Sequence, residues 1–197
     1  MSVLAIDLNS ISGIPVHPLV VHIPVMLVPL AFIGAIAALA RPSWRSWCLP
    51  LTAIFAGGAL VGVQLAMQSG EALQEIVSEG DALIQKHADL AEQARPIVFL
   101  FFLAAAAAAI AFHLINREDA DATESADSSR TATLRKALVP LLVLSVLTGA
   151  LSTAWIYRTG HSGAESVWKE KVAHGGGGEG GEGGGGRGEG GEGGEGN

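Results

Sequence analysis

The chain has 197 residues, of which 49% are apolar and only 16% are charged, whereas about 25% of the residues of a soluble domain are charged. This deficit indicates that lipid surrounds most of the chain, and the length allows one membrane domain of a few spans. The net charge is −7, and no basic stretch suits binding to nucleic acid. Cys48 is the single cysteine, which excludes an intrachain disulfide.

Four uncharged, apolar runs are long enough to cross a bilayer as helices, at about 18–40, 47–69, 96–116 and 137–157. A span needs about 20 such residues, because the hydrocarbon core is about 30 Å thick and a helix rises 1.5 Å per residue. We therefore expect an all-α, integral membrane four-helix bundle over residues 1–172. No cleaved signal peptide is expected, because the first basic residue, Arg41, follows the first apolar run.

Aromatic residues with one polar atom mark the ends of two spans and predict anchoring at the lipid headgroups. They are Trp44 and Trp47 after the first span, and Trp155 and Tyr157 at the end of the fourth. In the second span, Gly58 and Gly62 form a small-xxx-small pair, which predicts close helix packing within the bundle.

Residues 71–95, between the second and third spans, are acidic but carry apolar residues at helical spacing. They predict an amphipathic helix with His87 on its apolar stripe, facing the bundle or the membrane surface. The Gly/Glu-rich residues 173–197 cannot bury a core and are expected to be disordered.

Four histidines are expected at one membrane face. His17 and His22 begin the first span, His87 follows the second and His161 follows the fourth, so an even number of crossings separates them. Imidazole is a common ligand of haem iron and of transition-metal ions, and helix bundles build such sites from facing helices. His17, His22, His87 and His161 are therefore the candidate cofactor- or metal-binding residues, for haem b or a transition metal.

The first choice of axial haem ligands is His22 with His87 or His161, and His17 is the second candidate from the first span. Gly160 and Gly163 flank His161 and predict a sharp chain reversal that folds this histidine over the helix ends.

Two carboxylates are expected near these histidines in the bundle. Glu71 and Glu165 are candidate partners that orient a ligand histidine, or are solvated surface charges.

Two functions remain open from the residues alone. The first is a haem- or metal-binding membrane protein that transfers electrons, and the alternative is a non-enzymatic scaffold or assembly protein with structural histidines. An enzyme is the less favoured reading, because no Ser or Cys nucleophile motif stands beside the histidines.

Four short motifs resemble a bacterial membrane family catalogued as domain of unknown function 2231. They are GIPVHPLVVHIP at 13–24, SGEA at 69–72, HADLA at 87–91 and TGHSGA at 159–164. The resemblance implies a four-span bundle, and the family's motif histidines match His17, His22, His87 and His161. Some members are joined to cytochrome-like domains, so the resemblance also implies a haem link and a respiratory or cytochrome partner.

The resemblance places the chain in the bacterial cytoplasmic (inner) membrane as a multi-pass protein. Lys and Arg divide equally between the two sides, so the first span decides the orientation; it has no basic residue before it and Arg41 and Arg45 after it. We therefore expect both termini, and the four histidines, on the periplasmic side.

Overall fold

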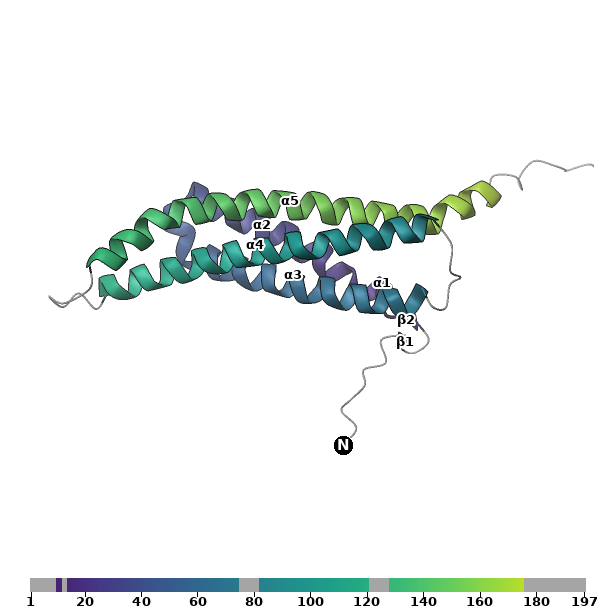
Figure 1. Ribbon diagram of the computed structural model, residues 1–197, viewed down its shortest axis with the longest axis horizontal. Helices are drawn as coiled ribbons and strands as arrows, with labels where there is room; N and C mark the ends of the chain where they lie inside the picture. Colours follow the sequence, from purple (N-terminus) through teal and green to yellow (C-terminus); the bar gives the residue numbers. More distant parts are fainter. Residues whose placement is uncertain (1–9, 12–13, 75–81, 121–127, 176–197) are drawn as a thin grey trace, which may run out of the picture.

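The computed structural model describes residues 10–11, 14–74, 82–120 and 128–175. A two-residue antiparallel pair, β1 (Ser10–Ile11) and β2 (Ile14–Pro15), precedes the helices and pairs Ser10 with Pro15. The remaining elements in chain order are α1 (His17–Val20), α2 (His22–Ala40), the 3-10 helix η1 (Pro42–Trp44), α3 (Arg45–Gln74), α4 (Ala82–Ala120) and α5 (Ser128–Gly175) (Figure 1).

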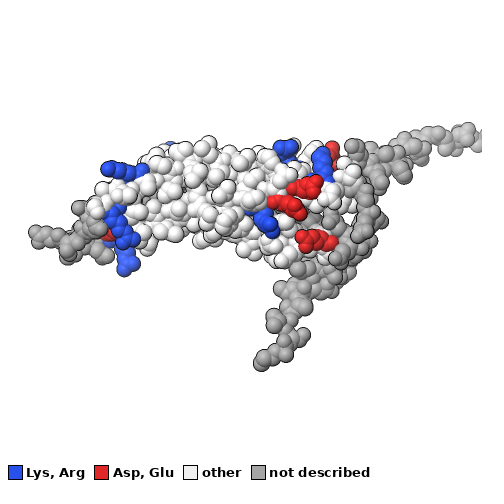
Figure 2. Space-filling model, viewed as in Figure 1, with Lys and Arg blue, Asp and Glu red and all other residues white. Residues whose placement is uncertain are grey.

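The long helices form a four-membered ring. Helix α3 packs between α2 and α4, and α5 closes the ring by packing against both α4 and α2. Four segments are long and apolar enough to cross a membrane: His17–Ala40, Pro42–Leu73, Ala82–Ala120 and Ser129–Glu165. Figure 2 shows charged side chains toward the two ends of the bundle, and the face between them carries few charges. The predicted all-α membrane bundle is confirmed.

Prolines set where the first helices begin and end. Pro24 lies in the first turn of α2 and lacks an N–H, and the chain breaks between α1 and α2 just before it, at Val21. Arg41 precedes Pro42, whose ring disfavours a helical conformation at the residue before it. Arg41 is accordingly extended, with φ −128° and ψ 101°, and α2 ends there.

Small residues line the inside of the ring and bring the helix backbones close together. Phe101 is the largest fully buried side chain, and it packs in a cluster with Ala31, Ala35, Ala56 and Ala105. As predicted, the glycines of α3 serve bundle packing: Gly62 lies against Ile23 and Pro24 at the start of α2, and Gly58 lies against Leu27.

The aromatic residues expected at the interfaces differ in their surroundings. Trp44 and Trp47 lie beside each other with ring centroids 5.8 Å apart and planes tilted by 43°, and Tyr157 is 72% exposed. Trp155 instead packs against the buried cluster around Val28, and Val98 belongs to the same cluster.

The structure differs from the predictions in the segment between the second and third spans and in the segment around His161. Within the predicted amphipathic segment, residues 82–95 are the first turns of α4, continuous with the third span. The predicted reversal around His161 is wrong, because α5 continues without interruption through Gly160 and Gly163 to Gly175. Of the predicted disordered tail, residues 173–197, the first three continue α5 to Gly175, which contradicts that part of the prediction, and the rest lie outside the described residues.

We predict that Gly62→Ala destabilises the bundle. An added Cβ would lie 2.6 Å from Ile23 Cγ2 and 2.9 Å from Pro24 Cδ, and such overpacking costs about 1–3 kcal/mol. The control is Gly160→Ala, because nothing lies within 4 Å of a Cβ at that position, and removing a glycine from a helix interior stabilises it by roughly 0.5–1 kcal/mol. Thermal unfolding of both variants in detergent measures the difference, and equal midpoints would contradict this packing.

Candidate functional site

Two of the predicted histidines meet at the end of the bundle where α1 and α4 begin. The rings of His17 and His87 lie edge to face, with centroids 6.2 Å apart and planes at 85°. Each ring is half-buried, and 70 residues of chain separate the two. We call these two residues the histidine pair.

His17 is held against α3. Its Nδ1 lies 2.9 Å from the carbonyl oxygen of Ala66 and 3.2 Å from Oγ of Ser69. Ser69 itself donates to the Ala66 carbonyl at 3.1 Å. The ring lies over Gly70, where an added Cβ would be only 3.1 Å from the imidazole Cε1, so a side chain at this position would push the ring away.

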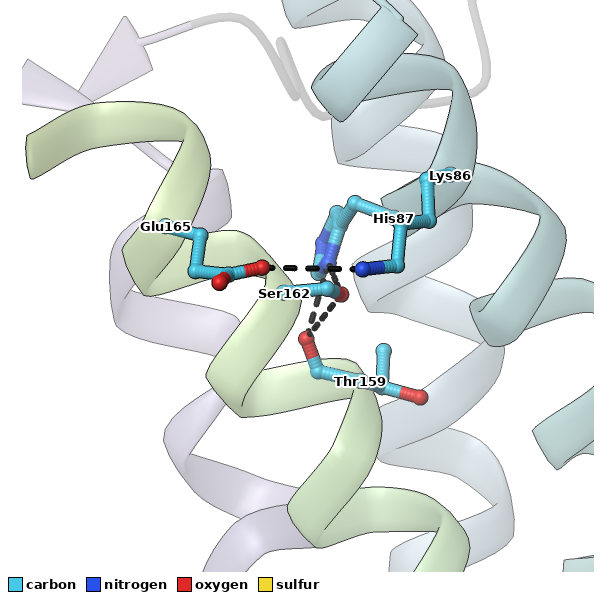
Figure 3. A network of polar contacts seen from close by, with 5 residues as sticks. All are labelled: Lys86, His87, Thr159, Ser162 and Glu165. Atoms are coloured by element: carbon cyan, nitrogen blue, oxygen red, sulfur yellow. Dashed lines mark hydrogen bonds and ion pairs between the residues drawn. The ribbon is translucent and has the colours of Figure 1, made fainter. Parts of the chain in front are cut away.

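His87 is held against α5 in the same way (Figure 3). Its Nδ1 lies 2.9 Å from the carbonyl oxygen of Thr159 and 3.2 Å from Oγ of Ser162. Ser162 donates to the Thr159 carbonyl at 2.8 Å, and a Cβ on Gly163 would lie 3.0 Å from the imidazole Cε1. We call each of these arrangements a cradle; its parts are a carbonyl, a serine three residues later and a glycine directly after it.

The cradles fix which nitrogen of each ring carries a hydrogen. A carbonyl oxygen only accepts hydrogen bonds, so the Nδ1 atom facing it must be the donor. In the neutral ring Nε2 is then the atom with the free lone pair. Among the described residues, neither Nε2 has a hydrogen-bond partner, so both imidazoles keep one basic nitrogen for a ligand.

His22 and His161 lie outside the histidine pair. His22 is exposed, and its Nδ1 turns back to the carbonyl oxygen of Pro18 at 2.7 Å. It follows His17 by five residues, which on a helix is about 140° further round the axis. His161 is also exposed, and its ring stacks on Tyr157 with centroids 6.2 Å apart.

The structure therefore brings together His17 and His87, whereas the sequence favoured His22 as the ligand from the first span. Whether any of the four histidines binds a cofactor stays a prediction. His113 is exposed near the other end of α4.

The predicted carboxylate partners do not bond to a histidine in the described part of the chain. Glu71 is exposed, and Glu165 pairs instead with Lys86 at 3.6 Å (Figure 3). This ion pair is well exposed, so solvent screens it and it adds little stability. Backbone carbonyls and serine hydroxyls orient the histidine pair, and no three His, Cys, Asp or Glu side chains gather as a metal site among the described residues.

Contacts to the histidine pair were not predicted for the cradle residues Ser69, Gly70, Ser162 and Gly163. A signal was present, because the dipeptide Ser-Gly occurs near the end of the second span and again shortly after the fourth. A serine and a glycine that recur together at equivalent places in two helices indicate that both helices make the same kind of close contact there.

Comparison with known proteins identifies the family. Searches of curated proteins and of solved structures found no match to this chain. The family described as "Predicted membrane protein (DUF2231)" matches residues 13–176, which include every helix described above up to Gly175. Since the match covers most of the chain and both cradles, the chain belongs to the DUF2231 family of predicted membrane proteins.

Proposed function

We propose that the protein binds haem through the histidine pair and transfers electrons at the membrane face. The observation that carries the proposal is the hydrogen bond from each Nδ1 to a backbone carbonyl, which is 2.9 Å long in both cradles. Histidines that ligate a metal almost always donate their other ring N–H to a carbonyl, a carboxylate or water, which fixes the tautomer and raises the basicity of the ligating nitrogen.

The donor set fits iron in a haem better than a bare metal ion. A structural zinc site uses four protein ligands and a catalytic one uses three, whereas the histidine pair supplies two nitrogens and no third ligating side chain joins them among the described residues. In a haem the macrocycle itself supplies four nitrogen ligands to the iron, so the protein would need to supply only the remaining one or two ligands. A transition-metal ion that accepts two imidazoles remains within the same proposal.

The spacing of the rings supports a shared ligand. A metal–imidazole bond is about 2 Å long, so two nitrogens on one ion lie about 4 Å apart. The ring centroids lie 6.2 Å apart, so a shared ligand needs both Nε2 atoms to turn toward the space between the rings. A bound haem would accept and release one electron at a time. The protein's own part is to hold both imidazoles in one tautomer and to surround them with helices.

A second candidate function is a membrane scaffold or assembly protein in which the histidines only join helices. The observation that favours it is that each histidine already bonds to a neighbouring helix, His17 to α3 and His87 to α5. The two candidates differ in one respect: a scaffold needs the Nδ1 bonds but makes no use of Nε2.

We further propose that the histidine pair faces the periplasm of a bacterial inner membrane, with a respiratory or cytochrome protein as the electron partner. Support comes from Arg41 and Arg45, the first basic residues of the chain, which follow the first span and favour the cytoplasmic side for the far end of the bundle.

We predict that His17→Ala and His87→Ala each abolish the Soret absorbance of the purified protein, because each removes one axial ligand. The measurement is a visible spectrum of the detergent-purified protein, oxidised and reduced, after expression with haem supplied. His22→Ala and His161→Ala are matched controls, since both side chains are exposed at the same end of the bundle and outside the pair.

Wild-type protein without a chromophore or stoichiometric metal would overturn the haem proposal and favour the scaffold. Loss of absorbance in the control variants, with retention in the His17 and His87 variants, would move the site to the other two histidines.

We predict that a reporter active only in the periplasm works when it is fused to either terminus, and that a cytoplasmic reporter does not. Fusions to the segment between α4 and α5 should give the reverse pattern. Activity of the cytoplasmic reporter at both termini would contradict this orientation and place the histidine pair on the cytoplasmic side.

A further inference from the structure

The two cradles are equivalent parts of the two halves of the chain. His87 follows His17 by 70 residues, while Ser162 and Gly163 follow Ser69 and Gly70 by 93 residues. The distances from Nδ1 to the carbonyl and to the serine are 2.9 and 3.2 Å in both. A geometry repeated with the same residue types suggests that the equivalence extends further along the helices.

The helices that carry the histidines bury the same positions. For each buried residue of α2, the residue 70 positions later in the sequence is a buried residue of α4. In α2 these are Pro24, Val28, Ala31, Ala35 and Ala38. In α4 they are Ala94, Val98, Phe101, Ala105 and Ala108.

The helices that carry the cradles match as well, with a shift of 93 residues. In α3 the buried residues with a buried counterpart are Leu49, Thr52, Ala56, Ala59, Val63 and Ser69. Their counterparts in α5 are Leu142, Ser145, Gly149, Ser152, Ile156 and Ser162. The shift is larger here because the second half has the longer connection: α4 continues to Ala120, while its counterpart α2 ends at Ala40.

The packing of the helices has the same symmetry. Within the halves α2 packs on α3 and α4 packs on α5, and between the halves α3 packs on α4 and α5 packs on α2. A half-turn about the long axis of the bundle exchanges the two halves and leaves this pattern unchanged. Parallel repeats related by an axis along the membrane normal are a known membrane-protein architecture.

We infer that the chain is a tandem duplication of one helical hairpin, and that its ligand lies on the axis between the copies, held by one imidazole from each. The ligand therefore has two equivalent faces, as a haem does, and Ser69 and Ser162 are equivalent positioning residues. The statement about the ligand rests on the proposed function, whereas the duplication rests on the helices alone.

The equivalence ends at the rim of the bundle. The positions equivalent to Lys86 and Glu165 are Val16 and Ala72, so only the His87 side carries the ion pair. Val16 is buried. The two cradles are thus alike where they touch the imidazoles and differ only outside them.

The first test uses the protein without a ligand. We expect Gly70→Ala and Gly163→Ala to lower the thermal unfolding midpoint relative to Gly160→Ala by similar amounts, because all three gain from loss of a helical glycine but an added Cβ would press on His17 and His87 at 3.1 and 3.0 Å. Gly160→Ala is the matched control in α5, where a Cβ meets nothing within 4 Å. A loss confined to one of the two cradle variants would overturn the equivalence of the halves.

The second test uses the haem-loaded protein and a redox titration. Ser69→Ala and Ser162→Ala each remove one acceptor of an Nδ1–H, which makes that imidazole a weaker electron donor to iron. We expect both to raise the midpoint potential by similar amounts, the double variant to raise it by their sum, and Ser145→Ala to leave it unchanged, because the Ser145 hydroxyl donates to the Leu141 carbonyl of its own helix.

The two tests fail separately. A wild-type protein that binds no haem would sink the proposed function but leave the equal stability losses as support for the duplication. A protein that binds haem through His17 and His87, yet shifts its potential in only one serine variant, would overturn equal positioning by the two halves.

Discussion

The hydrogen bond from each imidazole Nδ1–H to a carbonyl of a neighbouring helix constrains the rest of the structure. Those carbonyls, on Ala66 and Thr159, lie inside regular helices, so the ring must reach a second lone pair on an oxygen that helix formation already engages. Only a helix that comes very close allows this, and the glycine beside each serine makes room for the ring. The half-burial of the rings and their common tautomer follow from this bond.

Small residues extend the same closeness along the whole bundle. Lipid is as apolar as the helices, so helix association in a membrane depends on packing and interhelical polar contacts rather than on apolar burial. The inner seam is accordingly rich in alanine, glycine and serine beside its valines and leucines, with Phe101 filling the space beside Gly149. The histidine pair lies at the end of this seam, where close packing and interhelical hydrogen bonds occur together.

The spans were predictable from the sequence because length and lack of charge are local properties of a run of residues. The shared face of His17 and His87 was also predictable, since it depends only on the number of crossings. Which histidines meet was not, because this depends on the rotation of each helix about its axis, and His22, five positions after His17, lies about 140° further round that axis. Gly163 misled for a related reason: a glycine that permits a turn also permits a close contact, and only the packing of His87 shows which of the two operates here.

Helix α5 runs unbroken from Ser128 to Gly175, which at 1.5 Å per residue is about 72 Å and more than twice the hydrocarbon thickness of about 30 Å. Arg135, ion-paired to Asp119 at one end of the bundle, and the Thr159 carbonyl at the other therefore belong to one continuous helix, with Pro140 between them. Helix α3 is a second long helix, and it carries the acceptor for His17. Sliding of α3 relative to α5 would change the gap between the two imidazoles, so the membrane surface far from the histidines is mechanically connected to them.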